Sequence, residues 1–410
     1  MSQIDEMIQK MCPFGVPHIP VSDLFELKNG YTPSKAKVEF WQGGTIPWFR
    51  MEDIRANGRV LSSALQSIPE SATKGGKLFP ANSLLISTSA TIGEHALITV
   101  PHLSNQRFTS MTLKREHADK LDMKFLFFYC FVLAEWCKGN TTTSSFSGVD
   151  MAGFKKFKFP VPPLEIQREI VRVLDAFTEL EAELEAELEA RKKQYEYYRN
   201  QLLTFKPGGV RWVPMDEVAE VRSGWGFPNE FQGKTDLDYP FYKVSDMNLI
   251  GNESLLGVAN NYVSAADVKS LGINLAPAGT VVFPKIGAAV ATNKKRILST
   301  VSAYDNNVMG LVAGDQISSR FLFHYMKTIN LSALAHDSGA VPSIRKTEME
   351  KLEVPLPSIS DQLEIVRVLD AFETLVTGLT FGIPAELVAR RQQYKYYRHR
   401  LLTFKELEVA

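Results

Sequence analysis

The sequence predicts an α+β protein in which two mixed α/β globular segments are separated by two long helices that form an antiparallel coiled coil. Three observations predict this fold and its pseudo-two-fold internal repeat. The block Ile170–Phe177 recurs unchanged as Ile365–Phe372. An apolar stripe with helical spacing surrounds the first copy. Short apolar runs, punctuated by Gly and Pro, fill the segments between the blocks.

The repeat divides the chain into four segments. We expect globular segments at residues 1–155 and 207–350, a first long helix in 156–206 and a second long-helix region in 351–410. A second repeated block supports this division, because Leu202–Lys206 recurs as Leu401–Lys405 and Tyr-Tyr-Arg precedes both copies.

The first long helix is predicted from Ile166 onward, where apolar side chains recur at steps of three, four or seven residues up to Phe205. Pro162 and Pro163 mark its start, and Pro207 with two glycines marks its end. In the second copy, Gly378, Gly382 and Pro384 interrupt the pattern, so we expect that helix to kink or break.

Each globular segment is expected to hold several short strands and one helix. Residues 83–88 and 280–283 are predicted strands, because they are short apolar runs. Residues 122–138 and 318–335 are the predicted helices.

Composition argues against several classes of protein. Lys plus Arg equals Asp plus Glu at 46 each, so no overall basic field indicates a nucleic-acid partner. The most apolar run, 125–134, is too short to span a membrane, the N-terminus has no signal-peptide pattern, and three cysteines fit a reducing compartment. We therefore expect a cytoplasmic protein without a membrane partner.

Motifs of catalysis and metal binding are missing from the sequence. It has no phosphate-binding GxxxxGK[ST] loop, no Asn/Asp-Pro-Pro-Tyr motif and no dinucleotide-binding glycine pattern, and none of its seven histidines has ligand spacing. We expect neither catalytic residues nor a metal site.

The order of elements and the helix starts resemble the specificity subunits of type I restriction-modification enzymes. Pro160–Pro163 with Gln167, and Pro355–Pro357 with Gln362, match the family's helix starts. One departure is Ile166, which stands where the family usually has an acidic residue, as Asp361 does in the second copy. The resemblance covers nearly the whole chain.

The resemblance implies a non-catalytic subunit whose globular segments are target-recognition domains. Together they would read a bipartite asymmetric site in double-stranded DNA, two short half-sites with an unspecified spacer. The chain would dock two copies of the methyltransferase subunit and, through them, restriction subunits. This subunit itself would hold no cofactor, and S-adenosylmethionine, ATP and Mg are expected on the partner subunits.

Three tandem Glu-Leu-Glu-Ala units span residues 179–190. They resemble the tetrapeptide array of the type IC subclass, in which the number of units sets the spacing between the half-sites. A merely solvated acidic helix is the alternative interpretation.

Candidates for DNA contact are loop residues that combine Lys or Arg with amide or hydroxyl side chains. In the first globular segment they are Tyr31, Lys35, Lys37, Ser87, Ser89, Thr91, Asn105, Gln106, Arg107 and the tract 141–145. In the second they are Trp225, Lys243, Lys285, Asn293, Lys294, Lys295, Arg296, Asn306, Asn307, Ser343 and Arg345. Residues 105–107 and 294–296 are the preferred candidates, because Asn, Gln and Arg can contact a base with two hydrogen bonds. The alternative is that these loop side chains are only solvated.

Duplicated polar residues of the helix blocks are candidates for partner binding. They are Arg172, Asp175, Arg199, Arg367, Asp370 and Arg398. They would either hold the two helices together or present one docking surface twice.

Two other classes of function stay open. A coiled-coil scaffold without DNA specificity would fit the helices and the neutral charge. A subunit of a related fused methyltransferase–nuclease system would need a catalytic domain, for which the chain has no residues left.

Overall fold

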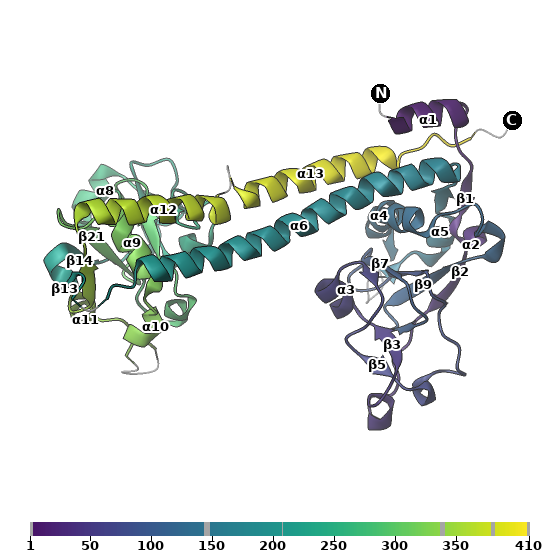
Figure 1. The fold of residues 1–410 in the computed structure, drawn as a ribbon, viewed down its shortest axis with the longest axis horizontal. Coiled ribbons are helices and arrows are strands. Elements are labelled where there is room, and N and C mark those ends of the chain that lie inside the picture. Colours follow the sequence, from purple (N-terminus) through teal and green to yellow (C-terminus); the bar gives the residue numbers. More distant parts are fainter. Residues whose placement is uncertain (1–2, 143–147, 207, 337–340, 379–381, 408–410) are drawn as a thin grey trace. The chain divides into compact units, whose positions relative to one another are not determined.

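The computed structural model describes residues 3–142, 148–206, 208–336, 341–378 and 382–407 (Figure 1). The chain forms two compact units. Unit 1 comprises residues 1–181 and 390–410, and unit 2 comprises residues 182–389. The first compact unit therefore includes both ends of the chain.

Unit 1 contains a five-stranded sheet in the order β2-β9-β6-β7-β4. Its strands are β2 (Phe25–Asn29), β9 (Phe108–Leu113), β6 (Ser83–Ser87), β7 (His95–Ile98) and β4 (Val60–Leu61). They pair antiparallel except for β4, which is parallel to β7. A three-stranded sheet has the order β5 (Ser67–Ile68), β3 (Ile46–Phe49) and β8 (Leu103–Ser104). Two strand pairs complete the unit: β1 (His18–Pro20) with β12 (Lys158–Pro160), and β10 (Thr141–Thr142) with β11 (Gly148–Val149).

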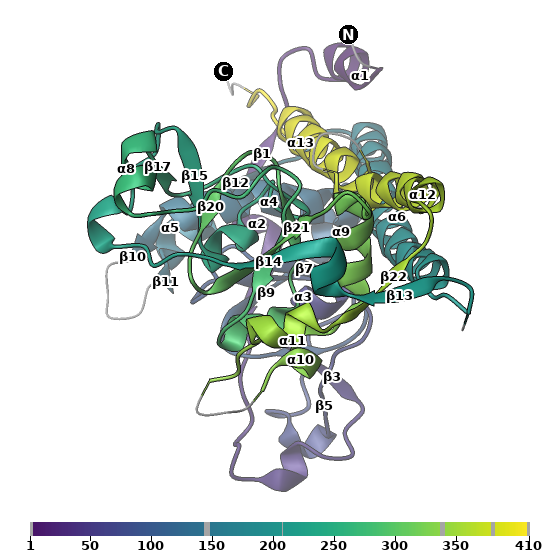
Figure 2. The ribbon, with the colours of Figure 1, turned by 90° about the vertical axis from the view of Figure 1, so that its left-hand side faces the viewer.

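Unit 2 repeats this topology, with a five-stranded sheet in the order β14-β21-β18-β19-β16. Its strands are β14 (Ala219–Ser223), β21 (Val308–Ala313), β18 (Val281–Pro284), β19 (Arg296–Leu298) and β16 (Leu255–Leu256). Its three-stranded sheet has the order β17 (Tyr262–Val263), β15 (Tyr239–Tyr242) and β20 (Ala303–Tyr304). The pair β13 (Arg211–Pro214) and β22 (Glu353–Leu356) corresponds to β1 and β12. Figure 2 turns unit 2 toward the viewer, where β14 lies beside its partner β21.

Each unit has one apolar helix in its core. In unit 1 it is α4 (Met123–Gly139), whose first turn is capped by Asp122 through hydrogen bonds from the backbone N–H groups of Lys124 and Phe125. In unit 2 it is α9 (Ser319–Thr328), with Phe321, Leu322 and Phe323 buried. The sequence predicted one helix to residue 335, which is wrong. The chain is extended at Ile329, and Asn330 then caps a separate short helix, α10 (Leu331–Leu334).

The remaining helices are short. They are α1 (Gln3–Met11), α2 (Val21–Leu24), α3 (Met51–Asn57), α5 (Met151–Lys156), α7 (Met215–Val218), α8 (Ala265–Ser270) and α11 (Lys346–Glu350).

The longest helix, α6 (Leu164–Leu202), contributes to both units, and the second copy of the helical region consists of α12 (Ile359–Thr377) and α13 (Ile383–Leu401). The expected break in the second copy is confirmed. In unit 1 the start of α6 lies antiparallel to the end of α13: Glu181 pairs with Arg391 at 2.5 Å, and Phe177 packs on Tyr394 and Tyr397. No helix in the described ranges is long and apolar enough to cross a membrane.

Candidate nucleic-acid interface

In each unit, the polar loops lie at one end of the strands of the five-stranded sheet. In unit 1, Asn29 at the end of β2 pairs with Thr109, and Ser87 at the end of β6 pairs with Phe108 at the start of β9. The same register occurs in unit 2, where Ser223 and Pro284 end their strands beside the start of β21. In each unit, the ends of two strands and the start of a third therefore lie together at one end of the sheet. We call this end of the sheet, with the loop residues next to these three strands, the loop edge of the unit.

A turn between two strands lies at the centre of each loop edge. In unit 1 it joins β8 to β9 through Asn105, Gln106 and Arg107, and the side chain of Asn105 accepts a hydrogen bond from the N–H of Arg107 at 3.0 Å. In unit 2 it joins β20 to β21, and Asp305 accepts from the N–H of Asn307 at 3.0 Å. Both are Asx-type turns, in which a side-chain oxygen replaces a backbone acceptor.

A glycine passes directly over each turn. A Cβ at Gly30 would lie 2.2 Å from the carbonyl oxygen of Asn105, and a Cβ at Gly224 would lie 2.0 Å from that of Asp305. Both distances are far below van der Waals contact, so any side chain at either glycine would displace the turn. The aromatic residue after each glycine is fixed as well, since the N–H of Trp225 donates to Tyr304 at 2.9 Å and that of Tyr31 donates to Ser104 at 2.8 Å.

Several unit 1 candidates gather at this loop edge. Gln106 and Arg107 are exposed at the turn, and Thr32 donates its hydroxyl to the Gln106 side chain. Tyr31 uses its hydroxyl internally, donating to the carbonyl of Ala72 at 3.0 Å and accepting from the N–H of Lys74.

The other unit 1 candidates vary in exposure. Ser87 is buried and bonded to the carbonyl of Ser89, whereas Ser89 is half-buried. The side-chain oxygen of Thr91 is buried without a described hydrogen-bond partner. Lys35 and Lys37 are exposed in the loop after Tyr31. Of the tract 141–145, residues 143–145 lie outside the described residues.

The unit 2 loop edge brings together Trp225, Lys285, Asn306 and Asn307. The Lys285 ammonium donates to the Ser223 hydroxyl at 3.0 Å, and the backbone N–H of Lys285 donates to the carbonyl of Asn307 at 2.8 Å. Burial lowers the pKa of Lys285, although the nearby Asp305 carboxylate opposes that shift. The half-buried side chain of Lys285 is therefore held in one orientation beside the turn by its bond to Ser223.

Three further unit 2 candidates flank this edge. The N–H of Ile344 donates to the carbonyl of Lys285 at 2.8 Å, which brings the half-buried Ser343 and the exposed Arg345 close to the turn. Lys243 directs its ammonium to Gln232 at 3.0 Å.

The segment 293–296 lies outside the loop edge as defined, and the structure contradicts the prediction made for one of its residues, Lys295. Lys295 is only 2% exposed, and its ammonium donates to Asn293 at 2.7 Å and to the carbonyl of Ile329. Arg296 donates to the carbonyls of Lys295 and Met247 at 2.8 and 3.1 Å. Lys294 donates to the side chain of Asn248. Lys295 is therefore withdrawn as a DNA contact because it is buried, whereas the exposed Asn293 and the half-buried Lys294 and Arg296 stay predictions.

Two residues at the unit 1 loop edge were missed from the sequence. Arg50 directly precedes α3, as Lys243 directly precedes the 3-10 helix η5 (Val244–Asn248). Each follows a residue whose carbonyl accepts a hydrogen bond from the turn, Phe49 or Tyr242. The internal repeat would have identified Arg50, because residues 47–53 align with residues 240–246, which pairs Arg50 with Lys243. Thr32 gave no signal in the sequence, since its contact with Gln106 arises only from folding.

The six partner-binding candidates divide into two kinds. Asp175 pairs with Lys124 at 2.6 Å, and Asp370 binds Arg320. Arg199 lies over the Tyr195 ring and Arg398 over the Phe131 ring, with 3.9 Å from the guanidinium carbon to the Phe131 centroid. Three of these contacts, those of Asp175, Asp370 and Arg398, hold a long helix to its own unit, whereas Arg199 packs on a residue of its own helix, α6. Arg172 and Arg367 are exposed, with Arg172 bonded to Glu169 of its own helix.

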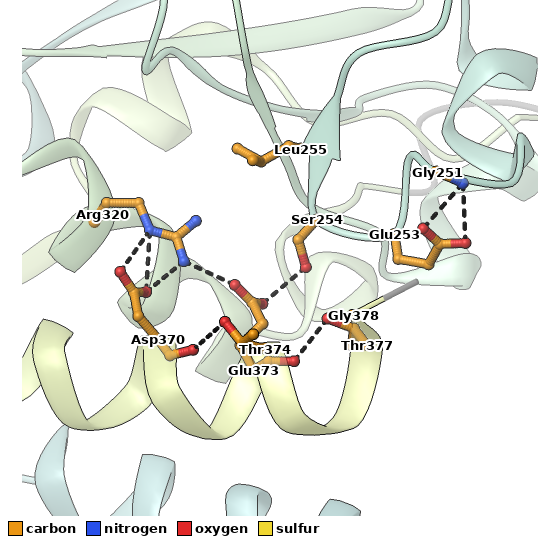
Figure 3. A pocket seen from close by; sticks show the side chains of 10 residues that line it. All are labelled: Gly251, Glu253, Ser254, Leu255, Arg320, Asp370, Glu373, Thr374, Thr377 and Gly378. Atoms are coloured by element: carbon orange, nitrogen blue, oxygen red, sulfur yellow. Dashed lines mark hydrogen bonds and ion pairs between the residues drawn. The ribbon is translucent and has the colours of Figure 1, made fainter. Parts of the chain in front are cut away.

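A pocket of about 630 Å³ lies beside α12 in unit 2 (Figure 3). Its floor is an ion-pair network, in which Arg320 donates to Asp370 at 3.1 Å and to Glu373 at 2.8 Å. Lys327 also pairs with Glu373, and its cation together with Arg320 keeps the pKa of that buried carboxyl below its usual value even though burial raises it.

The donor atoms of His324, Asp370 and Glu373 lie within 4.8 Å of one another, which is metal-ligand spacing. Two fixed cations already neutralise the carboxylates, and a metal ion there would be repelled by both. The cluster is therefore an ion-pair network that ties α9 to α12.

Comparison with known proteins agrees with this architecture. A family model described as "Type I restriction modification DNA specificity domain" matches residues 17–190 and 207–389. The EcoprrI specificity subunit of Escherichia coli is 44% identical over 396 residues, covering 93% of each chain. The EcoR124I/EcoR124II specificity subunit, also from Escherichia coli, is 32% identical over 66% of this chain and 70% of that protein.

The crystal structure of the S subunit of a type I restriction-modification system from M. genitalium covers 94% of this chain and 96% of its own, with a TM-score of 0.53 and 14% identity. A chain from a structure of the type I R-M system covers 95% of this chain and 97% of its own, with a TM-score of 0.64 and 17% identity. These likenesses show a shared fold. Because the family model matches both halves and a relative is 44% identical over nearly the whole length, the chain belongs to the family of type I restriction-modification DNA specificity subunits.

Proposed function

We propose that this chain reads a bipartite, asymmetric DNA site, with one loop edge on each half-site and an unspecified spacer between them. One observation carries the proposal: the two loop edges share one backbone arrangement but expose different side chains. Gln106 and Arg107 stand at one turn, and Asn306 and Asn307 at the other. A duplicated framework with different polar tips fits two modules that read different bases.

The assembly we propose contains two methyltransferase subunits, with restriction subunits bound through them. Its support is that the helices of each unit carry one exposed Arg and one exposed Tyr from the repeated blocks: Arg172 and Tyr396 in unit 1, and Arg367 and Tyr197 in unit 2. Tyr197 is 60% and Tyr396 61% exposed, and exposed Tyr and Arg are the side chains most often found as interface anchors. The same two exposed residue types in each unit fit two copies of one partner.

The chemistry we propose belongs to the partners: adenine-N6 methylation and ATP-dependent DNA cleavage. S-adenosylmethionine, ATP and Mg would bind to those subunits, and this subunit would supply sequence recognition alone. Three free thiols, Cys12, Cys130 and Cys137, fit a reducing cytoplasm.

The tetrapeptide array is proposed as a spacer, as in the type IC subclass. It lies within the continuous helix α6, where Leu180, Leu184 and Leu188 are half-buried and most of the glutamates are exposed. An acidic helical surface is repelled by phosphate, so the array would set distance and make no DNA contact.

Exchange of residues 1–155 for the first globular segment of another specificity subunit tests this function. Methylated adenines would be mapped in a host that expresses the whole complex. One half-site should change while the other stays as it was. A simultaneous change in both half-sites would refute independent reading, and no sequence preference with or without partner subunits would favour the scaffold alternative.

A further inference from the structure

Hydrogen bonds from neighbouring segments hold the backbone of each central turn in place. Besides the Asx bond, the N–H of Asn105 donates to Phe49 at 3.1 Å, and the N–H of Thr88 donates to the carbonyl of Arg107 at 3.0 Å. The equivalent bonds in unit 2 join Asp305 to Tyr242 at 2.9 Å and Lys285 to Asn307 at 2.8 Å. Since these backbone groups are satisfied within the unit, each turn serves to place its exposed side chains.

Those side chains differ in a chemically specific way. Unit 1 exposes Gln106 and Arg107, whereas unit 2 exposes Asn306 and Asn307. An Arg guanidinium matches the two acceptors O6 and N7 of guanine, and an Asn or Gln amide matches the donor–acceptor pair of adenine. The first turn therefore suits guanine and adenine, and the second suits adenine alone.

Resting on the proposed function, we propose that these turns are the base-reading tips and set the bases of the two half-sites. Arg107 selects a guanine and Gln106 an adenine in the half-site of unit 1. Asn306 and Asn307 select adenines in the half-site of unit 2. Thr32 helps to orient the Gln106 amide, because its hydroxyl donates to one lone pair of the Gln106 oxygen. The second lone pair can accept from adenine while an amide N–H donates to it.

Cations beside the tips have a separate role. The Lys285 ammonium is fixed on the Ser223 hydroxyl, and Arg345 is exposed nearby. A Lys ammonium is a point charge suited to phosphate, and phosphate contacts carry no base information. Lys285→Ala therefore serves as a matched control at the same loop edge.

A reciprocal exchange of tip residues tests the proposal. The full-length chain, co-expressed with its methyltransferase partner, would be incubated with randomised duplex DNA and the bound sequences determined. Arg107→Asn should replace guanine by adenine at one position of the first half-site, with a loss of guanine preference of about tenfold or more. Asn307→Arg should do the opposite in the second half-site. In each variant the unaltered half-site reports that the protein is folded.

The outcomes distinguish a failure of base reading by the turns from a failure of the proposed function. If a tip variant keeps the wild-type bases, or loses affinity equally for all sequences as Lys285→Ala should, the tips do not read bases and this inference is wrong. The proposed function would survive that result, as long as the wild-type complex selects two fixed half-sites. If the wild-type complex selects no sequence at all, the proposed function itself fails.

Discussion

The side-chain oxygen of Gln167 accepts a hydrogen bond from the backbone N–H of Asp122 at 2.8 Å, and Asp122 is the residue that caps α4. The amide nitrogen of the same Gln167 donates to the carbonyls of Lys120 and Pro162 at 2.8 and 2.6 Å. Gln362 repeats all three bonds in unit 2, with Ser318, Gln316 and Pro357. One buried glutamine thus joins the start of each long helix to its globular segment.

Gln167→Leu should lower the free energy of unfolding by about 2–3 kcal/mol, because it leaves one buried and two partly buried backbone groups without partners, and a fully buried group costs about 1–3 kcal/mol. Denaturant titration measures this loss. Gln201→Leu, an exposed position on the same helix, should change stability by no more than about 0.5 kcal/mol. Equal effects of the two substitutions would mean that the hydrogen bonds of Gln167 do not hold the unit together.

Lys295 should make the stability of unit 2 depend on pH in the alkaline range. Burial lowers the pKa of Lys295 to about 8, with a further contribution from the charges of Arg199 and Lys327, against 10.5 in the unfolded chain. Between these values the unfolded state binds more protons than the folded state, so stability rises with pH by up to about 1.4 kcal/mol per unit.

Lys295→Met is the matched control, since it removes the titrating group. The difference in unfolding free energy between wild type and variant should shift in favour of the wild type from pH 8 to pH 10. Parallel pH profiles for the two proteins would show that Lys295 titrates at an ordinary pKa and is not confined in the interior.

Arg296→Ala should weaken folding and leave base preference unchanged. Its guanidinium bonds two backbone carbonyls of unit 2, and their loss should cost about 1–3 kcal/mol. Thermal unfolding and selection from randomised duplex DNA would measure the two properties on one preparation. A stable variant with an altered second half-site would restore the original assignment of Arg296 as a base contact.

Much of the fold follows from patterns of spacing. The exact repeat at residues 170–177 and 365–372 predicts two similar units, and the apolar stripe predicts α6. Gly378 and Gly382 predict the break between α12 and α13, because glycine tolerates the positive φ of 105° seen at Gly382. The end of α9 could not be predicted, since Asn330 reads as one more polar residue until its side chain is seen to cap the next helix.

The candidate site was only partly accessible to sequence reasoning. Gln106 and Arg107 combine the residue types that read bases, and the structure exposes both. Lys295 and Arg296 form a second polar run, but Lys295 is buried and Arg296 half-buried, and no local pattern announces that difference. The distinction comes from contacts distant in sequence, such as the bond from Lys295 to the carbonyl of Ile329.

Insertion of one Glu-Leu-Glu-Ala unit after Ala190 tests whether the chain consists of two independent reading units on a helical spacer. Four residues lengthen a helix by about 6 Å and rotate its C-terminal part by roughly 40°. Bases rise by about 3.4 Å along a strand, so the unspecified spacer should grow by about one or two base pairs while both half-sites keep their bases. Leu184→Ala, which leaves the length of α6 unchanged, should not alter the spacer. The measurement is a map of methylated adenines in a host that expresses the complete complex: two unchanged half-sites with a longer spacer support the account, and an active variant with the original spacer contradicts it.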